Sequence, residues 1–213
     1  MNGTSRPAYW ARAKRALAAS DSTLGGIIAG HPRVALASRG DAFSTLARSI
    51  VGQQISVKAA DAVWGRFCAT CGELTPKSVL RRRATTLRGC GLSERKVEYI
   101  RDLCEHFISG RVDPTRFEEL DDEAIIAELT DIRGIGRWTA EMFLIFNLLR
   151  PNVLPLDDLG LMRAVSLHYL DGEPIVGREG RARVESLAVD WAPWRSVATW
   201  YLWRSLDPVP VEY

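Results

Sequence analysis

The sequence has no long hydrophobic run and no segment that resembles a signal peptide. Its longest apolar stretch, residues 142–149, is far shorter than the roughly 20 residues that a membrane-spanning helix needs. The first residues carry Arg6, Arg12, Lys14 and Arg15, but no apolar run long enough for export follows them. Internal repeats and low-complexity linkers are also absent. These absences predict a soluble, intracellular protein.

An excess of charge of one sign is missing as well. The 28 Lys and Arg residues are nearly balanced by 26 Asp and Glu residues, which gives a net charge of +2 and a pI near 8.4. Binding to a polyanion would therefore depend on where the basic residues are placed rather than on their total. With 213 residues, 46% of them hydrophobic, the chain can bury a core as one compact domain or as two small lobes.

Cysteines are few, and only two of them have the spacing of a metal site. Cys68 and Cys71 are separated by two residues, as in a zinc knuckle, but Cys90 and Cys104 lie far apart and no histidine follows at ligand spacing. The favoured interpretation is four reduced, structural thiols. A zinc or redox role is the alternative.

Strand patterns are absent, because no segment sustains an alternation of apolar and polar residues. Helical periodicity is present instead. Apolar residues recur at i, i+3, i+4 and i+7 in the stretch after Ser93, at Ile100, Leu103, Cys104 and Phe107. This spacing predicts a helix with one buried face. The predicted fold class is all-α.

Several helix starts are marked by capping residues or by acidic side chains. Thr75-Pro76 and Asp113-Pro114 each predict an N-cap followed by proline in the first turn, where the missing N–H costs nothing. The acidic segment 121–123 is typical of a helix N-terminus. A further helix is predicted over about 138–149, ending before Pro151.

Two glycines, one residue apart, precede that last helix. The segment reads Leu129-Thr-Asp-Ile-Arg-Gly134-Ile-Gly136-Arg-Trp138-Thr139-Ala140. Such glycines let the backbone turn sharply and expose N–H groups near a helix N-terminus, where the helix dipole favours an anion. The predicted phosphate contacts are Gly134, Gly136, Arg137 and Thr139, with Ile132 and Ile135 anchoring the hairpin from inside. An ordinary tight turn is the alternative.

An acidic pair lies twenty residues after Trp138. The chain reads Leu154-Pro155-Leu156-Asp157-Asp158-Leu159-Gly160. Proline followed by two aspartates predicts a helix start, with one carboxylate capping the helix and the other projecting into a cleft. The alternative is that the pair does no more than cap the helix.

Together, the hairpin and the acidic pair resemble the helix-hairpin-helix DNA glycosylase superfamily, and within it the 3-methyladenine DNA glycosylase II group. The resemblance extends from about Phe43 to Trp203. It implies an all-α fold with two helical lobes and a DNA-binding cleft between them. One lobe would comprise about 35–150, including the hairpin 129–140, and the other about 1–34 plus 151–213. The segments that carry the resemblance are Gly-Ile-Gly-Arg-Trp-Thr-Ala, Leu-Pro-x-Asp-Asp, Val51-Gly52-Gln53-Gln54-Ile55-Ser56-Val57-Lys58-Ala59 and Pro193-Trp194-Arg195-Ser196.

The resemblance implies a base excision repair enzyme that hydrolyses the N-glycosidic bond of alkylated bases such as 3-methyladenine and 7-methylguanine. The second aspartate of the pair, Asp158, would be the catalytic carboxylate, because a fixed anion stabilises the oxocarbenium character of the sugar in the transition state. Members that also cleave the strand carry a lysine where this chain has Trp138. A monofunctional enzyme that leaves an abasic site is therefore implied.

Other residues take pocket and wedge roles by the same resemblance. Trp138 and Trp203 match aromatic residues of the base pocket, with Met142 where relatives have a tyrosine; packing in the core is the alternative for the tryptophans. Gln54 matches the residue that relatives insert into the base stack, often as leucine, and Gln53 beside it is predicted to take part in the same intercalation. The alternative is that both glutamines serve a helix entrance.

No cofactor is expected. Iron–sulfur members carry four cysteines near the C-terminus, whereas the last cysteine here is Cys104. No metal site is predicted, although a monovalent cation held by carbonyls of the hairpin is left open. The segment 51–54 comes too early for the N-terminal β domain of some members, which indicates a minimal form.

The expected partner is double-stranded DNA that contains damaged bases, and the protein is expected to act as a monomer. Its expected location is the cytoplasm, at the nucleoid if the source is bacterial. The alternative function is a non-catalytic helix-hairpin-helix DNA-binding protein.

Overall fold

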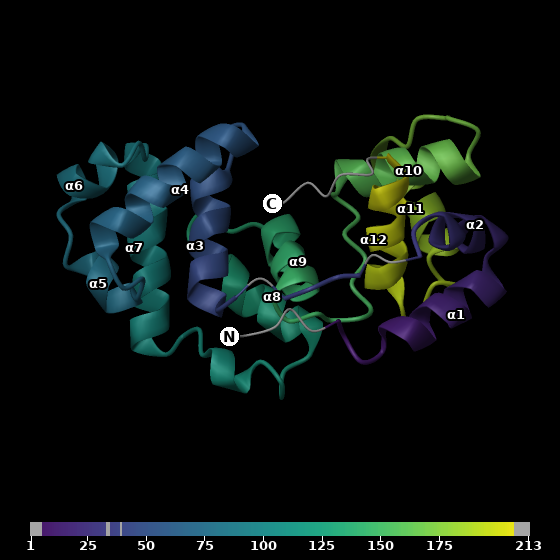
Figure 1. Ribbon diagram of the computed structural model, residues 1–213, viewed down its shortest axis with the longest axis horizontal. Coiled ribbons are helices and arrows are strands. Elements are labelled where there is room, and N and C mark those ends of the chain that lie inside the picture. Colours follow the sequence, from purple (N-terminus) through teal and green to yellow (C-terminus); the bar gives the residue numbers. More distant parts are fainter. Residues whose placement is uncertain (1–5, 33–34, 39, 207–213) are drawn as a thin grey trace. The chain divides into compact units, whose positions relative to one another are not determined.

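The computed structural model describes residues 6–32, 35–38 and 40–206. Over these ranges all regular secondary structure is helical and no strand occurs (Figure 1). The all-α prediction is confirmed. In the same part of the chain, no helix is long and apolar enough to cross a membrane.

The chain divides into two compact units, which are described separately below. Of the described residues, unit 1 holds 6–32, 35–38 and 144–206, and unit 2 holds 40–143. The division falls inside α9 (Arg137–Phe146), so this helix contributes residues to both units.

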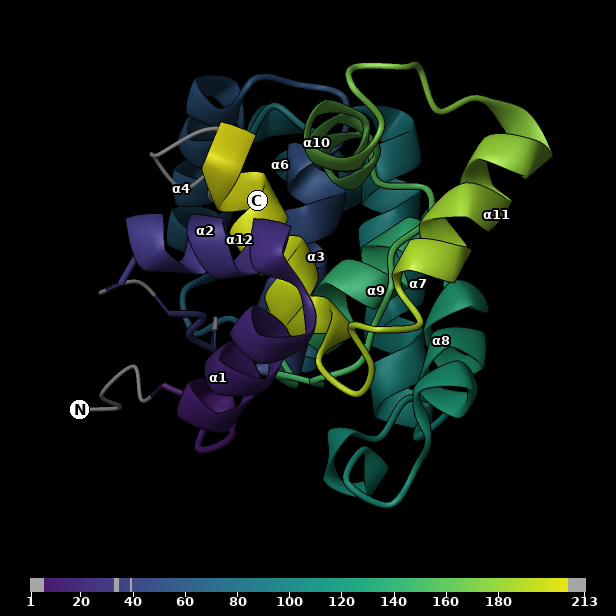
Figure 2. The same ribbon diagram turned by 90° about the vertical axis from the view of Figure 1, so that its right-hand side faces the viewer.

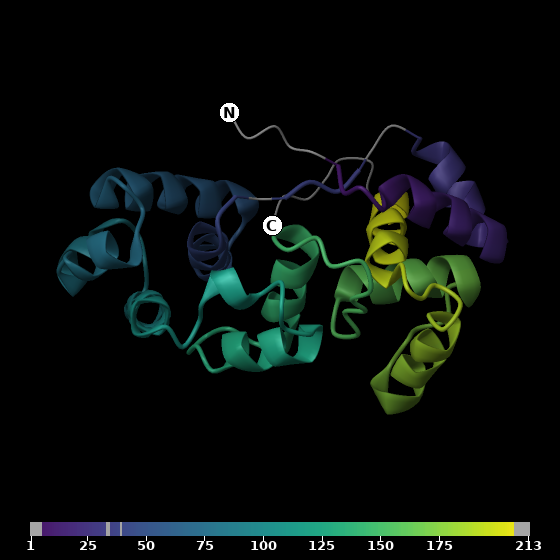
Figure 3. The same cartoon turned by 90° about the horizontal axis from the view of Figure 1, so that it is seen from below.

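Unit 1 is assembled around its last helix, α12 (Arg195–Leu206), which packs against α1, α2 and α10 (Figure 3). Every residue of α12 from Ser196 to Leu202 is buried, which explains why this segment shows no single apolar face. A loop connects α10 to α11 (Figure 2). The other helices of the unit are α1 (Trp10–Ser20), α2 (Ser22–Gly30), α10 (Leu159–Tyr169) and α11 (Gly177–Leu187).

Asp21 links three segments of unit 1. It is the N-cap of α2 and accepts a hydrogen bond from the backbone N–H of Leu24. Its other oxygen accepts hydrogen bonds from the Tyr169 hydroxyl at 2.6 Å and from the Trp191 indole at 3.0 Å. Burial, together with the bond to Asp21, raises the pKa of Tyr169. This aspartate therefore ties α2 to α10 and to the segment before α12.

Unit 2 is assembled around α7 (Glu94–Ser109), which packs against α3, α5 and α6 (Figure 1). The predicted core positions Ile100, Leu103 and Cys104 are buried, and Phe107 packs edge-on against Phe43. The other elements of the unit are α3 (Ala42–Gly52), α4 (Val57–Cys71), α5 (Pro76–Leu80), α6 (Ala84–Gly89), the 3-10 helix η1 (Pro114–Arg116), α8 (Asp122–Thr130) and the first seven residues of α9.

The predicted helix starts are mostly confirmed. Thr75 forms a capping box with Ser78 at α5, and Asp121 caps α8. Two predictions need correction. Asp113-Pro114 begins a single 3-10 turn rather than an α-helix. Helix α9 ends at Phe146 instead of near Leu149, because Leu149 has a left-handed φ of 55° and the chain turns back so that Arg150 N–H reaches the Leu144 carbonyl.

The four cysteines are free thiols in unit 2. Cys71, Cys90 and Cys104 are buried, and Cys68 is partly exposed. Burial raises the pKa of Cys71 to about 11 and that of Cys104 to about 12. Within the described ranges no cluster of three His, Cys, Asp or Glu side chains has the arrangement of a metal site.

Candidate active site

The carboxylate of Asp158 is buried in unit 1 and held at one oxygen by two donors. Its side chain is the N-cap of α10, and the residue is only 5% exposed. Oδ1 accepts hydrogen bonds from the backbone N–H of Leu161 at 2.6 Å and from the indole N–H of Trp203 at 2.7 Å. Bonds to a carboxylate are among the strong ones in proteins. The carboxylate is therefore fixed in position before any ligand binds.

The neighbouring carboxylate has a different environment. Asp157 is exposed and forms an ion pair with Arg181 at 2.6 Å. The sequence predicted that one aspartate caps the helix while the other reaches a cleft. In the structure the cap is Asp158, the residue that is also predicted to be catalytic, and Asp157 is the exposed member of the pair. A helix N-terminus favours an anion, so capping keeps a negative charge at this position.

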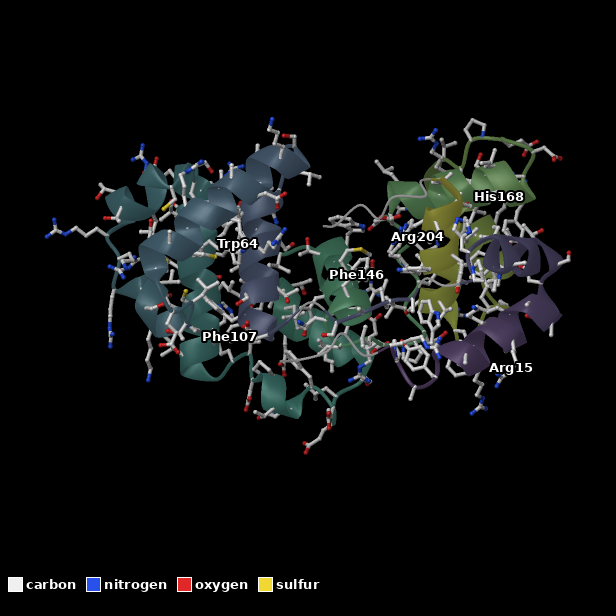
Figure 4. The ribbon with its side chains drawn as sticks, in the orientation of Figure 1. Arg15, Trp64, Phe107, Phe146, His168 and Arg204 are labelled. Atoms are coloured by element: carbon white, nitrogen blue, oxygen red, sulfur yellow. The ribbon has the colours of Figure 1, made fainter. Side chains whose placement is uncertain are left out.

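An aromatic pair lies beside Asp158. Trp203, on α12, stacks on Phe146 with ring centroids 5.7 Å apart and planes 13° apart; Figure 4 shows Phe146 at the end of α9. Gly160 makes this arrangement possible, since a Cβ there would lie 3.0 Å from the Trp203 ring and 3.1 Å from Oδ1 of Asp158. The structure thus brings Asp158 and Trp203 together. Phe146 and Gly160 were not predicted as site residues.

The other predicted pocket residues lie on the part of α9 that belongs to unit 2. Trp138 is partly exposed in the first turn, and Met142 is buried one turn later. Thr139 is 7% exposed. The side chain of Thr139 is therefore buried, whereas a helix leaves the backbone N–H groups of its first turn without helical partners. The phosphate contact of Thr139 stays a prediction.

The hairpin loop, residues 131–136, has the predicted form. Ile132 and Ile135 are buried and anchor it. Gly134 has a φ of 85°, and a Cβ on it would overlap the ring of Tyr99. Gly136 is exposed, and a Cβ there would meet no atom within 4 Å. The two glycines therefore meet different demands: Gly134 is required by the fold, whereas Gly136 leaves the surface of the loop open.

Arg137 is paired with acidic side chains in this structure. Its guanidinium binds Glu123 through two hydrogen bonds and Glu141 at 3.0 Å. The hydrogen bond from Arg137 lowers the pKa of Glu123, and the same contact raises the pKa of Arg137. The sequence predicted a positive charge beside the hairpin. The structure adds two carboxylates that offset that charge.

Residues 53–56 connect α3 and α4 and are called the wedge turn, after the role predicted for Gln54. Gln54 is exposed with a left-handed φ of 60°. Ile55, next to it, is also exposed. Gln53, also predicted to take part in intercalation, donates a hydrogen bond from its side-chain amide to the Gly134 carbonyl at 2.8 Å. Of the two glutamines, only Gln54 is exposed.

Side chains of α7 that the sequence did not assign to the site support these two loops. Lys96 donates hydrogen bonds to backbone carbonyls of the wedge turn and of α3, and burial lowers its pKa. Asp102 and His106 contact the hairpin loop. The signal in the sequence was a row of polar residues at intervals of three and four on one helix, a spacing that also fits a solvated face.

The chain matches the HhH-GPD superfamily of base excision DNA repair proteins over residues 47–205. It is 37% identical to DNA-3-methyladenine glycosylase 1 of Schizosaccharomyces pombe over 169 residues, which are 76% of this chain and 72% of that protein.

Solved structures give the same result. A DNA-3-methyladenine glycosidase from Bacillus halodurans is similar with a TM-score of 0.83 and 40% identity, over 92% of this chain and 89% of that one. The 3-methyladenine DNA glycosylase of Schizosaccharomyces pombe in complex with abasic DNA is similar with a TM-score of 0.76 and 32% identity, over 91% and 96% of the two chains. The predicted family is confirmed: the chain belongs to the HhH-GPD superfamily of base excision DNA repair proteins.

Proposed function

We propose that this protein is a monofunctional DNA N-glycosylase that removes alkylated bases from double-stranded DNA and leaves abasic sites. The observation that carries the proposal is the buried carboxylate of Asp158, fixed by the N-terminus of α10 and by the Trp203 indole. The relatives named 3-methyladenine glycosylases and the relative bound to abasic DNA support the same substrate and product.

Asp158 is assigned the task of stabilising positive charge on the sugar. Breaking the N-glycosidic bond gives the deoxyribose oxocarbenium character, and a fixed anion is most useful against charge that develops only in the transition state. At about 4 Å and an effective dielectric near 20, such a pair is worth roughly 4 kcal/mol. This corresponds to about a thousandfold in rate.

Water completes the reaction in this proposal. A lyase step needs an amine that attacks the sugar and forms a Schiff base, and the position that supplies a lysine in strand-cleaving relatives is Trp138 here. The product is then an intact strand with an abasic site. Neither a metal ion nor an iron–sulfur cluster takes part in the proposed reaction.

Aromatic side chains account for the preference for alkylated bases. Bases methylated at N3 or N7 are cationic, and a flipped cationic base gains about 2 kcal/mol from the face of an indole when desolvated. We assign this role to Trp138 and Trp203, with Met142 as a soft wall. Because the alkylated base is also a better leaving group, a broad substrate range follows.

The DNA backbone is the proposed partner of the hairpin loop. Gly136 leaves that loop open, and the first N–H groups of α9 follow it, which suits phosphate contacts that position DNA without reading sequence. Gln54 is proposed to fill the space that the flipped base leaves. The protein is proposed to act as a monomer inside the cell, at the nucleoid if its source is bacterial.

Release of methylated bases from alkylated duplex DNA tests the proposal. The expected result is free 7-methylguanine or 3-methyladenine in solution, undiminished by a metal chelator, and strand breaks only after heat or alkali. Strand cleavage without that treatment would indicate a lyase. DNA binding without any base release would indicate a non-catalytic DNA-binding protein, in which Asp158 only caps α10.

A further inference from the structure

One face of α7 carries four side chains that contact the wedge turn or the hairpin loop. Lys96, Tyr99, Asp102 and His106 follow one another at intervals of three and four residues, so they lie in a row along the helix. Figure 1 shows α7 beside α3, the helix that leads into the wedge turn. All of these elements belong to unit 2.

The N-terminal end of this row contacts the wedge turn and α3. The Lys96 ammonium donates hydrogen bonds of 2.7 Å to the carbonyls of Val51 and Gln53. These carbonyls lie at the C-terminus of α3, where a helix leaves its last carbonyls without helical partners and the helix dipole favours a cation. The backbone immediately before Gln54 is thereby fixed.

The other three side chains of the row contact the hairpin loop. The ring of Tyr99 packs against Gly134 so closely that no Cβ fits between them. Asp102 accepts a hydrogen bond of 2.8 Å from the backbone N–H of Arg133. His106 is buried, with one ring nitrogen 2.8 Å from the Asp102 carbonyl and the other 3.0 Å from the carboxylate of Asp131.

Gln53 joins the two loops directly. Its backbone carbonyl is bound by Lys96, and its side-chain amide donates to the carbonyl of Gly134 at 2.8 Å. Gln53 therefore belongs to the wedge turn through its backbone and is bonded to the hairpin loop through its side chain. A displacement of either loop would break a hydrogen bond to the other.

We propose that Gln53 and Lys96 are positioning residues that couple the hairpin loop to the wedge turn, so that seating the hairpin on phosphate holds Gln54 in its inserting position. This inference rests on the proposed function and deepens it. Neither residue needs to contact DNA for the coupling to operate. Gln54 is the residue through which both would act.

A thermodynamic cycle of variants tests the coupling. The single variants are Gln53→Ala, Lys96→Met and Gln54→Ala, and Arg95→Met is the matched control because it removes an exposed charge from the same helix. Gln53→Ala is expected to slow excision from duplex DNA about fivefold, the effect of one lost hydrogen bond, and Lys96→Met, which loses two, is expected to slow it at least as much. Excision from single-stranded DNA should not change, and Arg95→Met should match the unmodified protein on both substrates.

The double variants show whether the substitutions act on the excision rate together or independently. If Gln53 and Lys96 act by placing Gln54, adding either substitution to Gln54→Ala should cost little further rate on duplex DNA. Effects that multiply would overturn the proposal, and so would equal losses on duplex and single-stranded DNA, because a general loss of folding gives both. The fluorescence of a reporter base beside the lesion follows base flipping, and flipping should change across the variants in the same pattern as the excision rate.

Hydrogen exchange in the protein without DNA separates this inference from the proposed function. Gln53→Ala is expected to speed amide exchange in residues 131–136 severalfold, while Arg95→Met leaves it unchanged. Unchanged exchange in the hairpin loop of Gln53→Ala would overturn the coupling even if base release is normal. Faster exchange in a protein that releases no base would leave the coupling standing and overturn the proposed function instead.

Discussion

The indole of Trp203 contributes to the candidate site in two ways: it offers an aromatic face, and it binds the carboxylate of Asp158. Its N–H donates to Oδ1 of Asp158 at 2.7 Å, while its ring stacks on Phe146. A carboxylate that is oriented before the reaction needs no rearrangement when charge develops on the sugar. Phenylalanine would keep much of the ring and remove the donor.

We therefore expect Trp203→Phe to slow single-turnover base release about tenfold, the effect of one lost hydrogen bond to a charged group. Thermal unfolding checks that the fold is kept. The matched control is Trp64→Phe, a change on α4 in unit 2 (Figure 4). A rate for Trp203→Phe equal to that of the control would show that the hydrogen bond to Asp158 does not matter.

The sequence predicted both partners of this bond but not the bond itself. Asp158 and Trp203 are 45 residues apart in the chain, and only the packing of α10 against α12 brings them together. The sequence also could not decide which aspartate caps α10, because Asp157 and Asp158 both suit an N-cap. The pairing of Asp157 with Arg181 on α11 is what separates them.

At the scale of elements, the hairpin shows two glycines with separate tasks. Gly134 has a left-handed φ and packs against Tyr99, whereas Gly136 lies in open space. The pattern of two glycines predicted a phosphate-binding hairpin as a whole. It did not assign the tasks, since the Tyr99 ring comes from another helix.

Gly134→Ala should therefore lower the stability of the fold, whereas Gly136→Ala should weaken DNA binding. Gly134→Ala is expected to lower the free energy of unfolding by about 2 kcal/mol, from backbone strain and overlap with Tyr99. Gly136→Ala should leave unfolding within about 0.5 kcal/mol of the original and weaken DNA binding instead, because a methyl group keeps phosphate away from the backbone. Chemical denaturation and DNA titration of both variants provide the check. Equal losses of stability would contradict the separate roles.

The acidic partners of Arg137 lead to a further expectation. Glu123→Gln should strengthen DNA binding about threefold at low salt, since it removes a negative charge beside the proposed phosphate site, and the gain should shrink at high salt. Glu185→Gln on α11, which is also exposed, controls for net charge. Equal gains for the two variants would mean that the pair with Arg137 has no bearing on binding.

Helix starts were predicted better than helix ends. A start depends on local residues, as at Thr75 and Asp121, whose side chains bond to N–H groups three residues away. The end of α9 depends on the turn that carries the chain back to Leu144, and that turn is formed by Leu149 without any glycine to signal it. Its position was therefore misjudged by three residues.

At the scale of the whole molecule, both units bury weak acids that must stay protonated. The Tyr9 hydroxyl in unit 1 donates to the Leu149 carbonyl at 2.6 Å, and burial raises the pKa of Tyr9 to about 12. Burial also raises the pKa of Cys104, in unit 2, to about 12. In the unfolded chain such groups ionise near their ordinary pKa values, about 10 for tyrosine and 8.5 for cysteine.

Stability should therefore fall at alkaline pH. Below pH 10 Tyr9 is neutral in both states and its contribution is fully present; between about pH 10 and 12 only the unfolded state ionises, so the contribution is lost. We expect Tyr9→Phe to reduce the loss of unfolding free energy between pH 9 and pH 11 by about 1 kcal/mol, allowing for the partial exposure of the ring. An identical loss in both proteins, measured by chemical denaturation, would contradict this expectation.

The all-α class was predictable because periodicity, caps and the lack of strand patterns all agree. Family and activity were predictable for a different reason: two short motifs, the glycine hairpin and the acidic pair, match known enzymes. The side chains that hold these two motifs in place were not predictable. Lys96, Asp102 and His106 act through contacts between segments that are far apart in the sequence. Polar residues on a helix face give no sign of such contacts before the fold is known.

Base release by Asp158→Asn, compared with Asp157→Asn, tests the central claim most directly. Asparagine is also a good N-cap, so Asp158→Asn removes the negative charge while keeping an oxygen for the Leu161 N–H. Under single-turnover conditions on methylated duplex DNA, Asp158→Asn should release base at about a thousandth of the original rate or less, with DNA affinity nearly unchanged. Asp157→Asn, which loses only an exposed ion pair, should remain near the original rate. Near-normal release by Asp158→Asn would contradict the assignment of Asp158 as the catalytic carboxylate.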